Sequence, residues 1–239
     1  CTSAVTSQCL KKISRNISED NTNNVYKLYD PKLRKTLDKN NPEVFIYHTF
    51  GFESYGKDEN YVNKDDFNVC TLGDKLKDEL ENNYGIYTIN DNSVNESFNN
   101  TEKSYYLSGQ ILNKYCNNKN LKLIIDLNRE KTPDREENVV KINGENIARC
   151  MFSISRSNPY YVSNSDKSLK LMLISERLFP GYCRGVYYYN SDNVTLNQEK
   201  SGKIVCISIG SYVNTPDEAE NSVKYLARII GEYINMHLY

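Results

Sequence analysis

Short apolar runs alternate with segments of helical periodicity along most of the chain, and this alternation constrains the fold more than any other feature. We predict strands at residues 43–48, 86–89, 121–127, 186–189 and 204–209. Helices are predicted between them at 71–84, 102–117 and 166–178, and from residue 215 onward, with Thr71 as the N-cap of the first. This order predicts an α/β fold, a twisted and mostly parallel sheet flanked by helices.

Two local signals refine this prediction. Asn143-Gly144 separates the apolar runs 139–142 and 147–154, which is typical of a two-residue β-hairpin inserted into the fold. Thr215 followed three residues later by Glu218 predicts a capping box at the start of the last helix.

The length of 239 residues suits one core, and the chain divides into a flexible tether over residues 1–40 and a domain over residues 41–239. Its 30 basic residues nearly balance its 31 acidic residues, which argues against a nucleic-acid partner. No apolar run is long enough to span a bilayer.

The chain begins with Cys1, followed by a polar stretch, as a bacterial lipoprotein does after its signal is cleaved. Lipid on Cys1 would tether the domain to the outer face of the cytoplasmic membrane, an extracytoplasmic location. The alternative is that Cys1 is an arbitrary start of the chain.

The other cysteines form no C-x-x-C pair, which argues against a zinc knuckle. Cys150 and Cys206 lie in or beside apolar runs and are expected to be small buried core residues. An exported protein can also hold a disulfide bond, but the cysteine spacing does not identify the pair.

In a parallel sheet, chemistry gathers at the carboxyl ends of the strands. His48 ends the first predicted strand, and Glu53 follows five residues later, so an imidazole and a carboxylate could reach one zinc ion there. Taken alone this spacing is a weak signal, because a histidine at a strand end is more often a surface or core residue. His237, the other histidine, is expected to cap the last helix or to be exposed.

The surroundings of His48 resemble the stage II sporulation protein P family. Residues 46–55, Ile-Tyr-His-Thr-Phe-Gly-Phe-Glu-Ser-Tyr, are similar to the family motif I-Y-H-T-H-T-T-E-S-Y. Further similar segments follow in order at residues 69–85, 123–129, 144–152, 179–186 and 207–215. The resemblance implies an amidase-like fold and a zinc-dependent cell-wall amidase of spore engulfment, which cuts stem peptides from glycan strands.

The resemblance also implies a site of two histidines and one glutamate on zinc, with a second glutamate as general base. His48 and Glu53 fall on the first histidine and the glutamate ligand. Asn128 stands in place of the second histidine, and Ser208 stands in place of the general base. Phe50 replaces a further histidine of the motif.

These replacements remove chemistry that hydrolysis needs. An amide oxygen is a poor zinc ligand beside imidazole, so zinc is expected to bind weakly or not at all. A serine hydroxyl cannot act as a base near neutral pH, and losing the base alone costs a factor of about 100 or more.

We therefore favour a protein with impaired or lost hydrolysis that binds peptidoglycan or partners of the engulfment machinery. Arg129 and Arg184 are candidates to bind peptide carboxylates, and ordinary ion pairs are the alternative. A second hypothesis is an active zinc amidase that uses His48 and Glu53, with Asp126 as a substitute ligand. A third is a lipid-tethered scaffold that binds only proteins.

Overall fold

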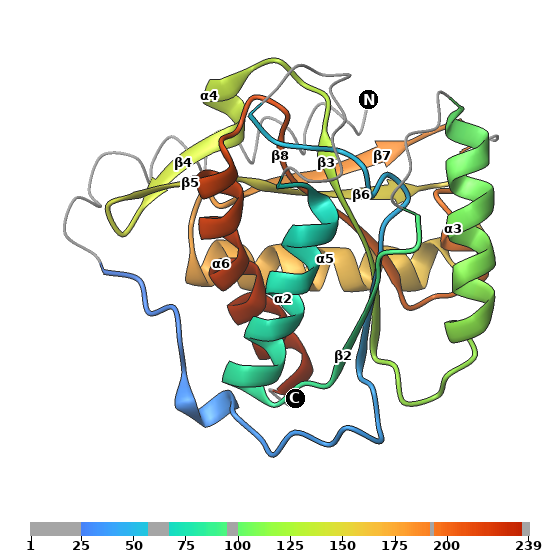
Figure 1. Ribbon diagram of the computed structural model, residues 1–239, viewed down its shortest axis with the longest axis horizontal. Helices are drawn as coiled ribbons and strands as arrows, with labels where there is room; N and C mark the ends of the chain where they lie inside the picture. Colours follow the sequence, from blue (N-terminus) through green and yellow to red (C-terminus); the bar gives the residue numbers. More distant parts are fainter. Residues whose placement is uncertain (1–24, 57–66, 95–99, 192–193, 236–239) are drawn as a thin grey trace.

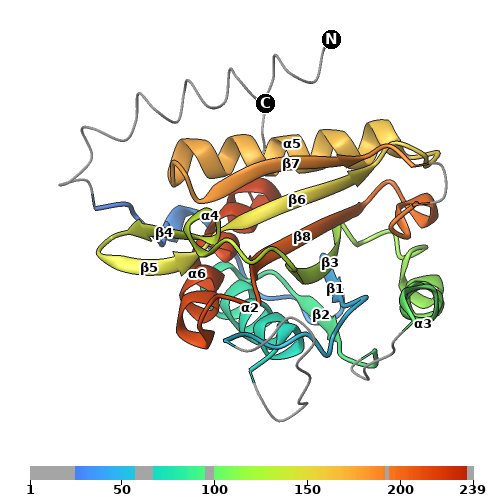
Figure 2. The same cartoon turned by 90° about the horizontal axis from the view of Figure 1, so that it is seen from above.

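A six-stranded sheet forms the centre of the molecule (Figures 1 and 2). The computed structural model describes residues 25–56, 67–94, 100–191 and 194–235. The strand order is β2-β1-β3-β8-β6-β7. The strands are β1 (Val44–Tyr47), β2 (Thr88–Asp91), β3 (Leu123–Glu130), β6 (Cys150–Ser155), β7 (Cys183–Tyr189) and β8 (Ile204–Ser211). Among the described residues of this sheet only the β6–β8 pairing is antiparallel, so the predicted mostly parallel α/β fold is confirmed.

Helices cover both faces of the sheet (Figure 2). On one face lie α2 (Val69–Tyr84), α5 (Tyr161–Leu178) and α6 (Pro216–Asn235), and on the other lies α3 (Thr101–Tyr115). Two short 3₁₀ helices, η1 (Pro31–Leu33) and η2 (Gln198–Lys200), and the short α4 (Arg135–Asn138) complete the described helices.

Strand β1 shows why the central strands are apolar throughout. Val44 and Ile46 pack into the larger core cluster beneath α2, α5 and α6. Phe45 and Tyr47 pack into the smaller cluster with α3. Each side chain is fully buried because the two faces of the sheet are both covered.

The predicted capping box at α6 is confirmed. The backbone N–H of Glu218 donates to the Thr215 hydroxyl at 3.2 Å, and the Thr215 N–H donates to the Glu218 carboxylate at 3.0 Å. The predicted cap of α2 is wrong: Asn68 caps that helix, and its side chain accepts from the N–H of Thr71 at 3.1 Å. Thr71 therefore lies inside the first turn.

The predicted hairpin turn is also confirmed, but its second strand is shorter than expected. Asn143 and Gly144 both have positive φ, and they join β4 (Val139–Ile142) to β5 (Glu145–Ala148). The run 147–154 is two strands, not one. Arg149 accepts a hydrogen bond from the Gly210 N–H at 2.8 Å, and the chain then continues as β6 in the main sheet.

Residues 25–40 pack against the domain. Leu33 is buried in the larger core cluster, and the Asn143 side chain makes hydrogen bonds of 2.7 and 2.9 Å to the backbone of Tyr26. A tether stays a prediction for residues 1–24, which lie outside the described residues, as does His237. None of the helices in the described ranges has the length and apolarity needed to cross a bilayer.

Candidate functional site at the strand ends

The carboxyl ends of β1, β3 and β8 meet at one edge of the sheet. Tyr47 of β1 lies opposite Asp126 of β3, and Asn128 lies opposite Ser208 of β8. The residue after Tyr47 is His48, so the sequence-predicted histidine lies at the same edge as these strand ends.

The ring of His48 is buried, and both of its nitrogens contact protein oxygens. Nδ1 lies 2.8 Å from the carbonyl oxygen of Leu127, and Nε2 lies 3.0 Å from Oδ1 of Asn90. Burial lowers the pKa of His48. The neutral ring donates from one nitrogen only, and the Leu127 contact favours a proton on Nδ1.

Helix α2 approaches the His48 ring closely at Gly73. A Cβ atom at residue 73 would lie 2.7 Å from both Cε1 and Nε2 of the ring. Only glycine therefore allows α2 and His48 to keep their present positions.

Glu53 is a buried carboxyl group with one oxygen left without a partner. The backbone N–H of Arg129 donates to the carboxylate, whereas Oε2 has no hydrogen-bond partner among the residues that the structure describes. Burial raises the pKa of Glu53 to about 7, against the opposing effect of the charges of Arg129 and Lys131. A buried carboxyl group that titrates near neutrality is often found at a functional site.

Asn128 is held on both sides of its amide. Its Nδ2 donates to Asp126 at 2.8 Å, and its Oδ1 accepts from the Phe50 N–H at 3.2 Å. Asp126 also accepts from the N–H and the hydroxyl of Thr49, at 2.9 and 2.7 Å. These bonds fix the segment after β1 to the end of β3, and they give Asp126 a structural role.

Aromatic rings lie beside this network. The ring of Phe50 makes edge-on contacts with Phe52 and Tyr105, at centroid distances of 6.2 and 5.6 Å. Ser208, nearly buried, lies between Asn128 and Met151 in the sheet. Tyr105 comes from α3, and neither it nor Asn90 was predicted, because nothing near them in the sequence marks a site.

Sequence comparison identifies the family. The family model for stage II sporulation protein P matches residues 4–231. The chain belongs to this family. Membership supports a peptidoglycan-related, amidase-like role in sporulation. No curated protein sequence matches the chain.

Solved structures of amidases share the fold of this stage II sporulation protein P family member. One is the CwlD amidase from Clostridioides difficile in complex with the GerS lipoprotein, with a TM-score of 0.53 and 15% identity over 80% of this chain and 98% of that chain. Another is an N-acetylmuramoyl-L-alanine amidase from Clostridium difficile 630, with a TM-score of 0.50 and 13% identity over 83% and 99% of the two chains. At these identities the likeness shows the fold alone.

The donor atoms at this edge do not complete the zinc site that the family resemblance implies. Over residues 25–56, 67–94, 100–191 and 194–235, no three His, Cys, Asp or Glu side chains gather where they could hold a metal ion. His48 and Glu53 are present, and the unpartnered Oε2 of Glu53 could accept a cation. A catalytic zinc ion takes three protein ligands, and the amide of Asn128 is already bonded within the protein.

The two predicted substrate-binding arginines are both bonded to protein oxygens. Buried Arg129 donates to the carbonyl oxygens of Ser54 and Glu130, at 2.7 and 3.1 Å. Arg184 donates to Asn138 at 3.0 Å and to Glu137 at 2.8 Å. Because β7 runs antiparallel to β8, Arg184 near its start lies at the same edge as Ser208. Arg184 is partly exposed, so it remains the better candidate.

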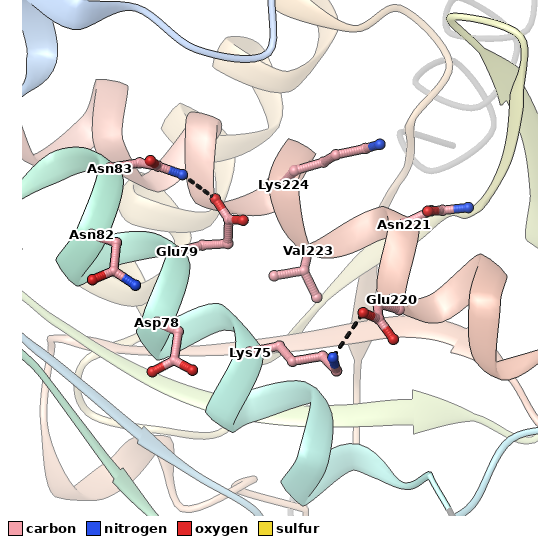
Figure 3. Close-up of a pocket in the computed structure, with 9 residues that line it drawn as sticks. All are labelled: Lys75, Asp78, Glu79, Asn82, Asn83, Glu220, Asn221, Val223 and Lys224. Carbon is pink, nitrogen blue, oxygen red and sulfur yellow. Dashed lines mark hydrogen bonds and ion pairs between the residues drawn. The ribbon is translucent and has the colours of Figure 1, made fainter.

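A separate polar groove of about 300 Å³ runs between α2 and α6 (Figure 3). Both lysines that line it form ion pairs: Lys75 lies 2.7 Å from Glu220, and Lys224 lies 2.5 Å from Glu145. It is lined by Lys75, Asp78, Glu79, Asn82, Asn83, Glu220, Asn221, Val223 and Lys224. None of the predicted site residues lines this groove.

Proposed function

We propose that this protein binds peptidoglycan at the edge formed by β1, β3 and β8, and that it has lost hydrolysis. The observation that carries the proposal is the set of hydrogen bonds that the Asn128 side chain makes. Its amide is bonded to Asp126 and Phe50, and it lies beside Ser208, which stands where the family resemblance implies the general base.

Binding can persist when catalysis is lost. Contacts to the ground state of a substrate are separable from the groups that stabilise its transition state. Phe50 and Phe52 add apolar surface to the segment after β1, which favours binding over proton transfer. Arg184 is the residue that we assign to the carboxylates of the stem peptide.

The proposal includes a location and partners. We place the protein outside the cytoplasmic membrane, tethered through lipid on Cys1, where peptidoglycan and other engulfment proteins are accessible. The CwlD amidase, which has a similar fold, was solved in complex with the GerS lipoprotein, and this supports protein partners as well.

Co-sedimentation with purified sacculi tests the binding part of the proposal. The native protein should pellet with sacculi, and Arg184→Gln should bind several-fold more weakly while keeping its melting temperature within a few degrees. Arg34→Gln, a change of the same charge at an exposed position, should bind as the native protein does. A native protein that stays in the supernatant with sacculi but captures sporulation proteins would support the scaffold hypothesis instead.

An active zinc amidase is the second candidate, and Glu53 is the observation that favours it. A buried carboxylate oxygen without a partner, on a group whose pKa is raised to about 7, suits a metal ligand. Elemental analysis of protein purified without added metal distinguishes the two. Stoichiometric zinc that disappears in Glu53→Gln would support the active enzyme, and metal-free native protein would support the binding protein.

A further inference from the structure

We propose that Cys150 and Cys183 form a disulfide bond that joins the first residues of β6 and β7. In this parallel pair Cys150 lies opposite Cys183, and the register shifts between Cys150 and Phe152. The sequence alone could not identify this pair, because 32 residues separate the two cysteines and α5 lies between them.

The geometry of neighbouring strands suits the bond. Side chains in register on adjacent strands point to the same face of the sheet, and both cysteines belong to the larger core cluster. Neighbouring strands lie about 4.8 Å apart. Disulfide-bonded cysteines have Cα atoms roughly 4.4 to 6.8 Å apart, a range that includes this strand spacing.

The thiols already contact each other. A hydrogen bond from the Cys150 thiol to Cys183 adds to burial in raising the pKa of Cys150. The Cys183 sulfur accepts the N–H of Gly185 at 3.3 Å, which orients it. The other described cysteines are Cys70 in α2, Cys116 after α3 and Cys206 in β8, and no strand pairing in the described chain puts any of them opposite a cysteine.

The reaction is a thiol–disulfide exchange with a low-molecular-weight disulfide as oxidant. Cys183 is 6% exposed and Cys150 is fully buried, so Cys183 attacks first. Its thiolate bonds to one sulfur of the oxidant and releases the other as a thiol. The Cys150 thiolate then attacks the mixed disulfide at Cys183 and releases the second thiol. The two cysteines lose two electrons to the oxidant, and their two protons end on the released thiols.

The bond would fasten β7 to β6 at the edge of the sheet where Arg184 lies. It would close a loop that contains α5, which restricts the unfolded chain more than the folded one. Disulfide bonds persist outside the cytoplasm, so its presence in the cell depends on the proposed location. Formation of the disulfide bond in solution does not depend on that location, and it is independent of any peptidoglycan binding.

Peptide mapping of the full chain tests the proposal. The protein is incubated with oxidised glutathione, its remaining thiols are alkylated, and it is digested with trypsin. Arginines flank both cysteines, so the expected product is peptide 150–156 linked to peptide 178–184, which separates on reduction. The oxidised protein should melt about 5 to 10 °C above the reduced protein.

Variants identify the pair. Cys183→Ser should abolish the linked product, whereas Cys206→Ser should keep it. Recovery of both peptides in alkylated form after oxidation of the native protein would overturn the proposal. So would a product that links Cys150 or Cys183 to any other cysteine. The test of the native chain stands even if a variant fails to fold.

Discussion

Glu53 and Asp126 are two buried carboxyl groups near the same sheet edge, and burial raises the pKa of both. The pKa of Glu53 rises from 4.5 to about 7, and that of Asp126 rises from 3.8 to about 6, despite the hydrogen bonds from Thr49. The folded protein therefore holds protons that the unfolded chain releases. The free energy of unfolding falls as pH rises from the ordinary pKa values, 3.8 and 4.5, to the raised values of about 6 and 7. This loss of stability is complete above about pH 7.

Glu53→Gln should remove the larger part of this pH dependence. The variant cannot ionise, so at pH 8 its free energy of unfolding should exceed that of the native protein by about 1 to 3 kcal/mol. The difference should vanish below the unfolded pKa of 4.5. Urea denaturation at a series of pH values measures it.

Glu102→Gln, at an exposed position in α3, is the matched control and should leave the pH profile unchanged. If Glu53→Gln unfolds with the same pH profile as the native protein, Glu53 is not a destabilised buried carboxylate.

The sequence could locate single residues but not their partners. His48 was predicted at a strand end, and it lies there. Its ring contacts Leu127 and Asn90, 79 and 42 residues away, and only the strand order brings them together. Arg129 was a candidate to bind substrate, and its guanidinium donates to the carbonyl oxygen of Ser54, 75 residues earlier.

Helix α6 depends on its capping box, which the sequence predicts. Thr215→Ala removes the acceptor for the Glu218 N–H and should cost about 1 kcal/mol. For a chain of this length, this lowers the melting temperature by about 2 to 4 °C. Thr101 is exposed in α3, a helix capped by Asn100, and Thr101→Ala should lower the melting temperature by less. Equal effects of the two substitutions would contradict the assigned cap.

Helix α2 depends on Gly73 for its contact with His48. Gly73→Ala puts a methyl group against the ring and should cost about 1 to 3 kcal/mol, with a shift of the His48 ring resonances in NMR spectra. In Gly109→Ala of α3, the new methyl group meets the flexible end of Lys200, which can move away. An unchanged His48 resonance in Gly73→Ala would rule out the close contact.

Local signals predicted most elements, and long-range pairing explains the errors. The Asn143-Gly144 turn depends only on its own backbone, so it was predicted correctly. The break at Arg149 depends on a hydrogen bond from Gly210, 61 residues later, so the run 147–154 was expected to be one strand.

At the scale of the whole molecule, the chain keeps the α/β scaffold, whereas the family resemblance implies that two groups of its site are replaced. The six-stranded sheet and its flanking helices are present, and the family model matches residues 4–231. The two implied replacements, Asn128 and Ser208, lie opposite each other near the ends of β3 and β8. The alternation of elements predicted the fold class correctly, and the altered site stays a prediction from the family resemblance.

Mass spectrometry of the products released from purified sacculi tests the central claim most directly. The native protein is incubated with sacculi and added zinc, beside an active N-acetylmuramoyl-L-alanine amidase as positive control. We predict that the native protein binds the sacculi and releases no stem peptides. Stem peptides released by the native protein, and not by Glu53→Gln, would contradict the claim and would require a zinc site that includes Glu53 and other residues of the chain.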